Sequence, residues 1–116
     1  GPGTYGCVLP QDLLNKQVGI CTLLTECGII RTDNEAVTWV HSGVLRVNHN
    51  PISTTAMAIG PMSFNEEESI ILDFGKDITV VIKRTLAEFD KELESGSKWR
   101  ALWVTSDTSS DKKENK

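Results

Sequence analysis

The sequence predicts a small, mainly β domain in which five short strands close into a barrel and a short helix joins the last two strands. Three observations lead to this fold class. Strand-like runs are separated by turn residues, no strand–helix–strand repeat is present, and the earliest strand-like run is apolar on both faces. A chain of 116 residues is long enough to bury one hydrophobic core.

Composition divides the chain into three parts. Residues 1–15 contain glycine and proline and are predicted to form an N-terminal leader. The start Gly1-Pro2-Gly3 is typical of a scar left when a protease removes an expression tag, so we expect an excised piece of a larger protein. Residues 16–105 are predicted to form the barrel. Residues 106–116 are polar and charged, and we expect them to be disordered.

Strands are predicted over residues 17–25, 26–32 and 36–47. In the earliest of them, apolar side chains alternate but occupy both faces, which is typical of a buried strand. In the last of them, Trp39 and His41 share one face and Val40 points to the other, because side chains alternate along a strand. The alternation leaves open whether Trp39 faces the core or the solvent.

Residues 48–69 interrupt the pattern with turn signals at Pro51 and Gly60-Pro61. A connection of this length is unusual in a compact domain. It either packs down through its methionines and phenylalanine or serves as a partner-binding loop, and we favour packing. Its run of three glutamates is expected to be a solvated face.

The remaining elements are the fourth and fifth strands at residues 76–84 and 98–105, with a short strand or edge segment at residues 70–74 and a helix at residues 85–97. The helix is indicated by the capping box Thr85-Leu86-Ala87-Glu88, in which a threonine and a glutamate satisfy the first free amides. This order of elements fits an OB-type barrel best, then an SH3-like or Tudor-like barrel, then a PH-like barrel.

Charge and composition exclude several function classes. The net charge of −4 provides no positive field for sequence-independent binding of nucleic acid. No apolar run is long enough to span a membrane, and no secretory leader is present, so we expect an intracellular monomer, cytoplasmic or nuclear. Three cysteines without C-x-x-C spacing and two histidines predict neither a metal site nor a cofactor.

Catalytic residues are not indicated either. The carboxylates at positions 73, 77, 88 and 92 are divided between strand ends and a helix and do not converge. Ser42 directly follows His41, so on a strand the two side chains point to opposite faces and cannot pair as nucleophile and base. We therefore predict a protein that is not an enzyme.

Five short motifs lie in the order of the cold-shock domain. They are Val18-Gly19-Ile20, Gly28-Ile29-Ile30, Trp39-Val40-His41, residues 75–80 (GKDITV) and residues 100–104 (RALWV). Over residues 17–105, interrupted at 48–69 and 85–97, the chain resembles that family. It also resembles the cold-shock-like barrels near the N-terminus of Armitage-type RNA helicases of small-RNA silencing, in which a W-R-A segment closes the barrel.

The resemblance implies a module that binds single-stranded RNA weakly or supports assembly of a ribonucleoprotein. Trp39 and His41 match the family's base-stacking F-V-H motif, and base stacking is worth roughly 1–3 kcal/mol per base. The family's two further aromatics are absent, because Cys27 and Ile29 stand in that region. Local positive charge is expected from Arg31, Lys83, Arg84, Lys98 and Arg100.

The alternative is a protein-docking module with no nucleic-acid binding. Its contact would come from the 48–69 loop or the 85–97 helix. The candidates are Met57, Ile59, Met62, Phe64 and Phe89.

Overall fold

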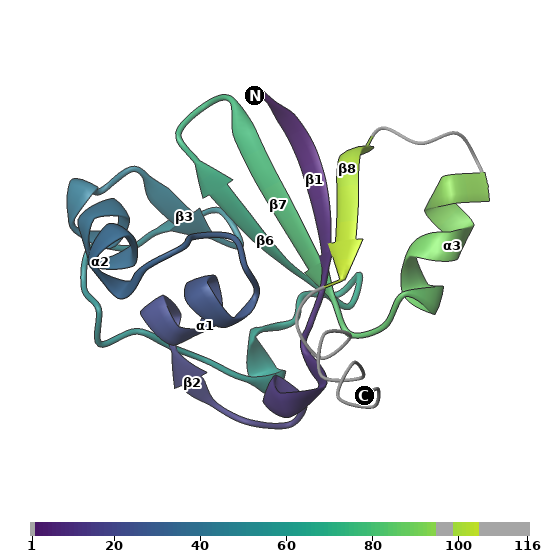
Figure 1. Cartoon of the computed structure of the whole chain (residues 1–116), viewed down its shortest axis with the longest axis horizontal. Helices are drawn as coiled ribbons and strands as arrows, with labels where there is room; N and C mark the ends of the chain where they lie inside the picture. The colour runs from purple at the N-terminus through teal and green to yellow at the C-terminus, as the bar shows by residue number, and fades with distance from the viewer. Residues whose placement is uncertain (1, 95–98, 105–116) are drawn as a thin grey trace, which may run out of the picture.

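The computed structural model describes residues 2–94 and 99–104, with only the backbone for 91–94 and 99–104. Its main feature is a mixed six-stranded sheet in the order β4-β3-β6-β7-β1-β8 (Figure 1). The strands are β1 (Gly3–Val8), β3 (Leu45–Val47), β4 (Asn50–Pro51), β6 (Ser69–Phe74), β7 (Ile78–Lys83) and β8 (Trp99–Val104). β1 is parallel to both neighbours, and the other pairs are antiparallel.

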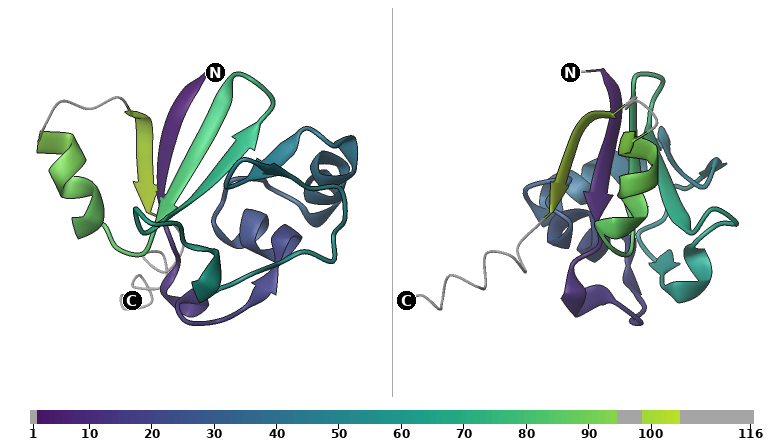
Figure 2. Two further views of the ribbon diagram at one scale, coloured as in Figure 1. Left: turned by 180° about the vertical axis from the view of Figure 1, so that it is seen from behind. Right: turned by 90° about the vertical axis from the view of Figure 1, so that its right-hand side faces the viewer.

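The remaining elements surround this sheet. β2 (Val18–Gly19) and β5 (Ala58–Ile59) form a separate antiparallel pair. The helices are α1 (Ile20–Glu26), α2 (Asp33–Ser42) and α3 (Ala87–Glu94), with 3₁₀ turns at Gln11–Leu13 and Pro61–Ser63. α1 and α2 lie together beside β3 and β6, and α3 lies at the opposite end beyond β8, in both face views (Figures 1 and 2). None of the described helices is long and apolar enough to cross a membrane.

The mainly β prediction is confirmed at this coarse level, but the closed barrel is not found. Within the described residues β4 and β8 are the two edges of an open sheet. Residues 3–8, assigned to the leader from composition, form β1 between β7 and β8. The predicted tail at 106–116 lies outside the described residues.

The elements predicted after residue 69 are confirmed. The strands expected at 70–74, 76–84 and 98–105 correspond to β6, β7 and β8, and the helix expected at 85–97 is α3. Half of the expected capping box is present, because the Glu88 carboxylate accepts the Thr85 amide at 3.2 Å. β6 and β7 alternate clearly between the two faces of the sheet, so period-two reasoning succeeds there.

The strands predicted over residues 17–25, 26–32 and 36–47 are wrong. These residues form β2, α1, a loop, α2 and β3. Ile20, Leu23, Leu24 and Cys27 are fully buried, and their spacing of three and four is the period of a helix that packs one face on the sheet. Because this run is apolar at most positions, alternation and helical periodicity were both compatible with it.

The 48–69 connection packs down, as favoured. The Asn48 side chain donates to the Ser63 carbonyl at 2.7 Å and accepts the Ile71 amide at 2.9 Å, tying the loop to β6. Ile59 is buried, and Met57 and Phe64 pack partly buried against the core. The loop is therefore part of the domain's structure.

Candidate nucleic-acid interface

An open depression lies where the α1–α2 loop meets the exposed side of α2. It is lined by residues from both: Ile29, Ile30, Arg31, Asn34, Glu35, Thr38 and Trp39. Two of these, Arg31 and Trp39, were predicted from the sequence as nucleic-acid contacts. The structure brings them to one surface although they come from different elements. We call this the Arg31–Trp39 surface.

The loop has this course because a glycine follows α1 and a capping threonine precedes α2. Gly28 follows α1 at φ 72°, a left-handed conformation that favours glycine, and it turns the chain so that the Ile29 and Ile30 amides donate to the Leu24 carbonyl. Thr32 then caps α2, its hydroxyl accepting the Glu35 amide at 3.1 Å. Residues 29–31 are thereby held between two fixed helix ends.

Trp39 lies in the second turn of α2 with 38% of its surface exposed. Its ring meets Phe74, at the end of β6, in a T-shaped arrangement with centroids 5.3 Å apart and planes at 86°. Edge-to-face packing of this kind fixes ring orientation and contributes about 0.5–1.5 kcal/mol beyond buried area. Trp39 is therefore a pre-oriented aromatic with part of its surface open to a ligand.

The charge of the Arg31–Trp39 surface is balanced. Arg31 is exposed and is the cation of the lining, and Glu35 is the anion. Asp33, also exposed, begins α2 nearby. Such a surface can contact one phosphate through Arg31 but cannot attract a polyanion over a long range. Aromatic contact must supply most of any affinity for nucleic acid.

His41 does not join this surface, which corrects the expectation that it shares a face with Trp39. That expectation assumed a strand. On α2, side chains two residues apart point about 200° apart around the helix axis, because each residue turns by about 100°. His41 is exposed on the far flank of α2 from Trp39.

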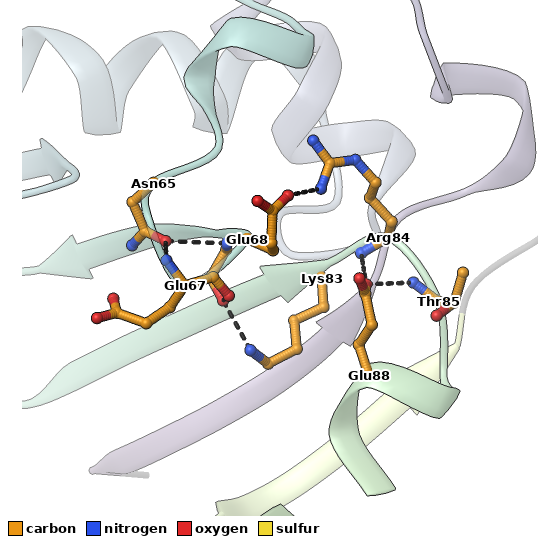
Figure 3. Close-up of polar contacts among 8 residues, drawn as sticks. Asn65, Glu67, Glu68, Lys83, Arg84, Thr85 and Glu88 are labelled. Carbon is orange, nitrogen blue, oxygen red and sulfur yellow. Dashed lines mark hydrogen bonds and ion pairs between the residues drawn. The ribbon is translucent and has the colours of Figure 1, made fainter. Parts of the chain in front are cut away.

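Lys83 and Arg84 are corrections of a different kind, because the fold uses both side chains. Lys83 is only 5% exposed; its ammonium donates to the Ser69 hydroxyl at 2.8 Å and lies 5.6 Å from the Phe89 ring centre. The Arg84 guanidinium carbon lies 3.7 Å from the centre of the Phe64 ring. Arg84 also forms an ion pair with Glu68, which Figure 3 shows. The two cations join the 64–69 loop to the start of α3 and are not presented to phosphate.

The other predicted cations are not placed at the surface by this structure. Lys98 lies outside the described residues. Arg100 lies on β8, where the backbone alone is described.

The residues proposed for protein docking are mostly internal, which corrects that alternative. Ile59 and Phe89 are buried, with 2% and 0% of their surfaces exposed. Met57 is partly buried against the core, and Phe64 is half-buried beneath Arg84. Met62 alone of the five is fully open, at 96% exposure. These side chains are internal because the loop and the helix use them to pack on the sheet.

Two of the carboxylates weighed above as possible catalytic groups, Asp73 and Glu88, make contacts within the fold. Asp73 accepts the Thr79 hydroxyl at 2.6 Å and lies 3.6 Å from His49 Nδ1, and Glu88 accepts the Arg84 amide at 3.0 Å. In the part of the chain that the structure describes, no three His, Cys, Asp or Glu side chains form a group suited to a metal ion.

Sequence reasoning missed Asn34, Glu35 and Thr38, which line the Arg31–Trp39 surface. A usable signal was present. Thr32-Asp33-Asn34-Glu35 has the same T-x-x-E spacing that identified α3, and it marks the start of a helix whose exposed side carries these three residues.

Part of this chain is similar to a small part of a larger enzyme, tyrosine–tRNA ligase. Over 75 residues the chain is 29% identical to the tyrosine–tRNA ligase of Bradyrhizobium diazoefficiens, a match that covers 65% of this chain and 18% of the ligase. It is 30% identical over 70 residues to the tyrosine–tRNA ligase of Brucella abortus, covering 60% of this chain and 17% of that protein. The chain thus spans less than a fifth of these relatives. No protein-family model matches the chain.

Proposed function

We propose that this chain is a non-enzymatic RNA-binding module whose contact surface is the Arg31–Trp39 surface. The observation that carries the proposal is the meeting of an exposed, pre-oriented tryptophan and an exposed arginine on one open depression. The partial similarity to tyrosine–tRNA ligases supports RNA as the ligand, because those proteins act on tRNA by name. Since the match covers less than a fifth of them, their ligase reaction is not proposed for this chain.

The chemistry of the surface favours unpaired nucleotides. The open part of the Trp39 ring provides a stacking face for a base, worth roughly 1–3 kcal/mol, and such stacking does not require a particular base. Arg31, on the same depression, can donate to a phosphate of the stacked nucleotide. Asn34 and Thr38 add hydrogen-bonding groups at the rim. One base and one phosphate per surface make a weak interaction.

This surface gives the proposal a salt signature. For single strands the logarithm of the binding constant falls with the logarithm of salt concentration by about 0.7 per phosphate neutralised. With Arg31 as the cation of the lining, the expected slope is that of one phosphate. A steep slope would require a cationic surface elsewhere in the chain.

The test is a titration of the ¹⁵N-labelled protein with a short single-stranded RNA and, separately, with an RNA hairpin whose loop has the sequence of that single strand. We expect amide shifts at residues 29–39, a shallow salt slope, and loss of binding in Trp39→Ala. Met62→Ala is the matched control, because Met62 is exposed but lies in the 61–63 turn, outside the lining. Unchanged spectra at millimolar RNA, or equal losses in both variants, would refute the proposal.

A role in assembly of a small-RNA silencing complex is the finer form of the proposal. The resemblance to Armitage-type helicases supports it. That resemblance relied on strands predicted over residues 17–47, and this segment is mainly helical in the structure. The RNA titration is independent of this finer assignment.

A further inference from the structure

Two of the three cysteines meet in the core of the domain. Cys7 is on β1 and Cys27 is the residue that ends α1, and both are fully buried. The Cys7 thiol lies 3.6 Å from the Cys27 carbonyl oxygen, across twenty residues of sequence. A hydrogen bond with the Cys27 side chain, together with burial, raises the pKa of Cys7 well above the ordinary thiol range. The Cys7 thiol therefore lies directly against Cys27.

The position of Cys27 connects this pair to the Arg31–Trp39 surface. The Cys27 amide donates to the Leu23 carbonyl at 2.9 Å, and the Ile29 amide donates to the Leu24 carbonyl at 3.0 Å. Residues 29–31, which line the depression, thus follow Cys27 after a single glycine. A displacement of Cys27 is transmitted to Arg31 through four consecutive peptide units.

We propose that Cys7 and Cys27 form a redox pair that oxidation converts to a disulfide, linking β1 to the end of α1 and repositioning residues 29–31. The two thiols lose two protons and two electrons as the sulfur–sulfur bond forms. A disulfide oxidant such as oxidised glutathione accepts them and leaves as two thiol molecules. The two sulfur atoms are about 2.05 Å apart in a disulfide, so its formation draws the end of α1 and β1 together.

Burial controls the rate of this reaction. The attacking species is a thiolate, which the surroundings of Cys7 strongly disfavour, so oxidation proceeds through transient opening of the end of α1. Cys21 is the internal comparison. It lies on α1 and is only half-buried, so alkylating reagents reach it in the folded protein.

The first experiment maps the disulfide in the folded protein. After incubation with oxidised glutathione, remaining thiols are alkylated and the protein is digested without reduction. We expect the mass to fall by two hydrogen atoms, two of the three alkylatable thiols to disappear, and a peptide linking Cys7 to Cys27. Cys21→Ser should form the same link, and Cys7→Ser should not. Persistence of Cys7 and Cys27 as thiols, or a link through Cys21, would overturn the redox pair.

The second experiment tests the effect on the Arg31–Trp39 surface, and this step rests on the proposed RNA-binding function. Oxidised protein should show shifted amides at residues 28–31 and weaker RNA binding than reduced protein, with recovery after reduction. Unchanged RNA binding by disulfide-linked protein would refute the coupling. Absence of RNA binding in both states would refute the proposed function while the disulfide map stands unaffected.

Discussion

Two regions of the molecule combine an arginine with an aromatic ring, and they use the combination differently. At the β7–α3 junction, Arg84 stacks on Phe64. It also pairs with Glu68, as Figure 3 shows. At the Arg31–Trp39 surface, the ring packs on Phe74 and the arginine lines an open depression beside it. At the junction the arginine and the ring contact each other, whereas at the surface Arg31 and Trp39 both remain partly open to solvent.

The difference shows that residue type alone does not separate a binding site from a structural contact. A cation stacked on a ring and paired with a carboxylate has little left to offer a ligand. An exposed ring held by another aromatic retains a face for one. The junction should therefore affect stability, and the surface should affect binding.

The largest effect is expected at the junction, from Phe89→Ala. Phe89 is fully buried, and truncating a buried phenylalanine costs about 3–5 kcal/mol of the free energy of unfolding. Urea denaturation measures this loss. Leu86→Ala, at a site with 49% exposure just before α3, is the control and should cost much less. Equal losses in the two variants would show that α3 is not docked through Phe89.

At the surface, Trp39→Ala should weaken RNA binding by roughly 5- to 150-fold, the loss of one base-stacking contact. Its free energy of unfolding should fall by less than that of Phe89→Ala, because the ring is partly exposed. Binding is read from the titration and stability from urea denaturation. If Trp39→Ala lowered the free energy of unfolding as much as Phe89→Ala while the RNA affinity stayed normal, the ring would be a core residue only.

The pH dependence of stability tests whether the fold shields the Cys7 thiol from solvent. The pKa of Cys7 is raised in the folded protein, whereas an unfolded thiol titrates at about 8.5. Above that pH the unfolded chain releases a proton that the folded chain keeps, so stability is full below about pH 8.5 and falls by about 1 kcal/mol per pH unit above it. Urea denaturation at pH 8 to 10 should show this slope, reduced in Cys7→Ala. Equal slopes in both proteins would place Cys7 in contact with solvent.

The smallest effects separate the two arginines. Arg84→Ala should lower the free energy of unfolding by about 1 kcal/mol, the loss of an exposed ion pair and a cation–π contact, and leave RNA binding unchanged. Arg31→Ala should leave stability within about 0.5 kcal/mol and reduce the salt slope of RNA binding toward zero. Reversed outcomes would exchange the roles of the two regions.

Particular residues show how far the sequence could lead. β6, β7 and α3 were predictable because their two faces differ in polarity and because Thr85 and Glu88 mark a helix start. α1 was not, because an apolar run from Ile20 to Leu24 fits both periods, and the choice depends on the sheet beneath it. Arg31 and Trp39 were found as single residues. Their meeting depends on the turn at Gly28 and the start of α2 at Thr32, which neighbour-by-neighbour alternation cannot reveal.

The place of β1 in the sheet has a consequence for synthesis on the ribosome. Gly3 pairs with Ile78, a separation of 75 residues (78 − 3), and β8 follows later still. β1 therefore emerges long before either neighbour exists. The α1–α2 pair and the β3–β4 hairpin, built from short-range contacts, can form early, while the sheet closes around β1 as a late and slow step. A nascent chain of this protein exposes β1 as an unpaired strand until β7 has left the exit tunnel, and that strand is the segment a chaperone would have most reason to hold.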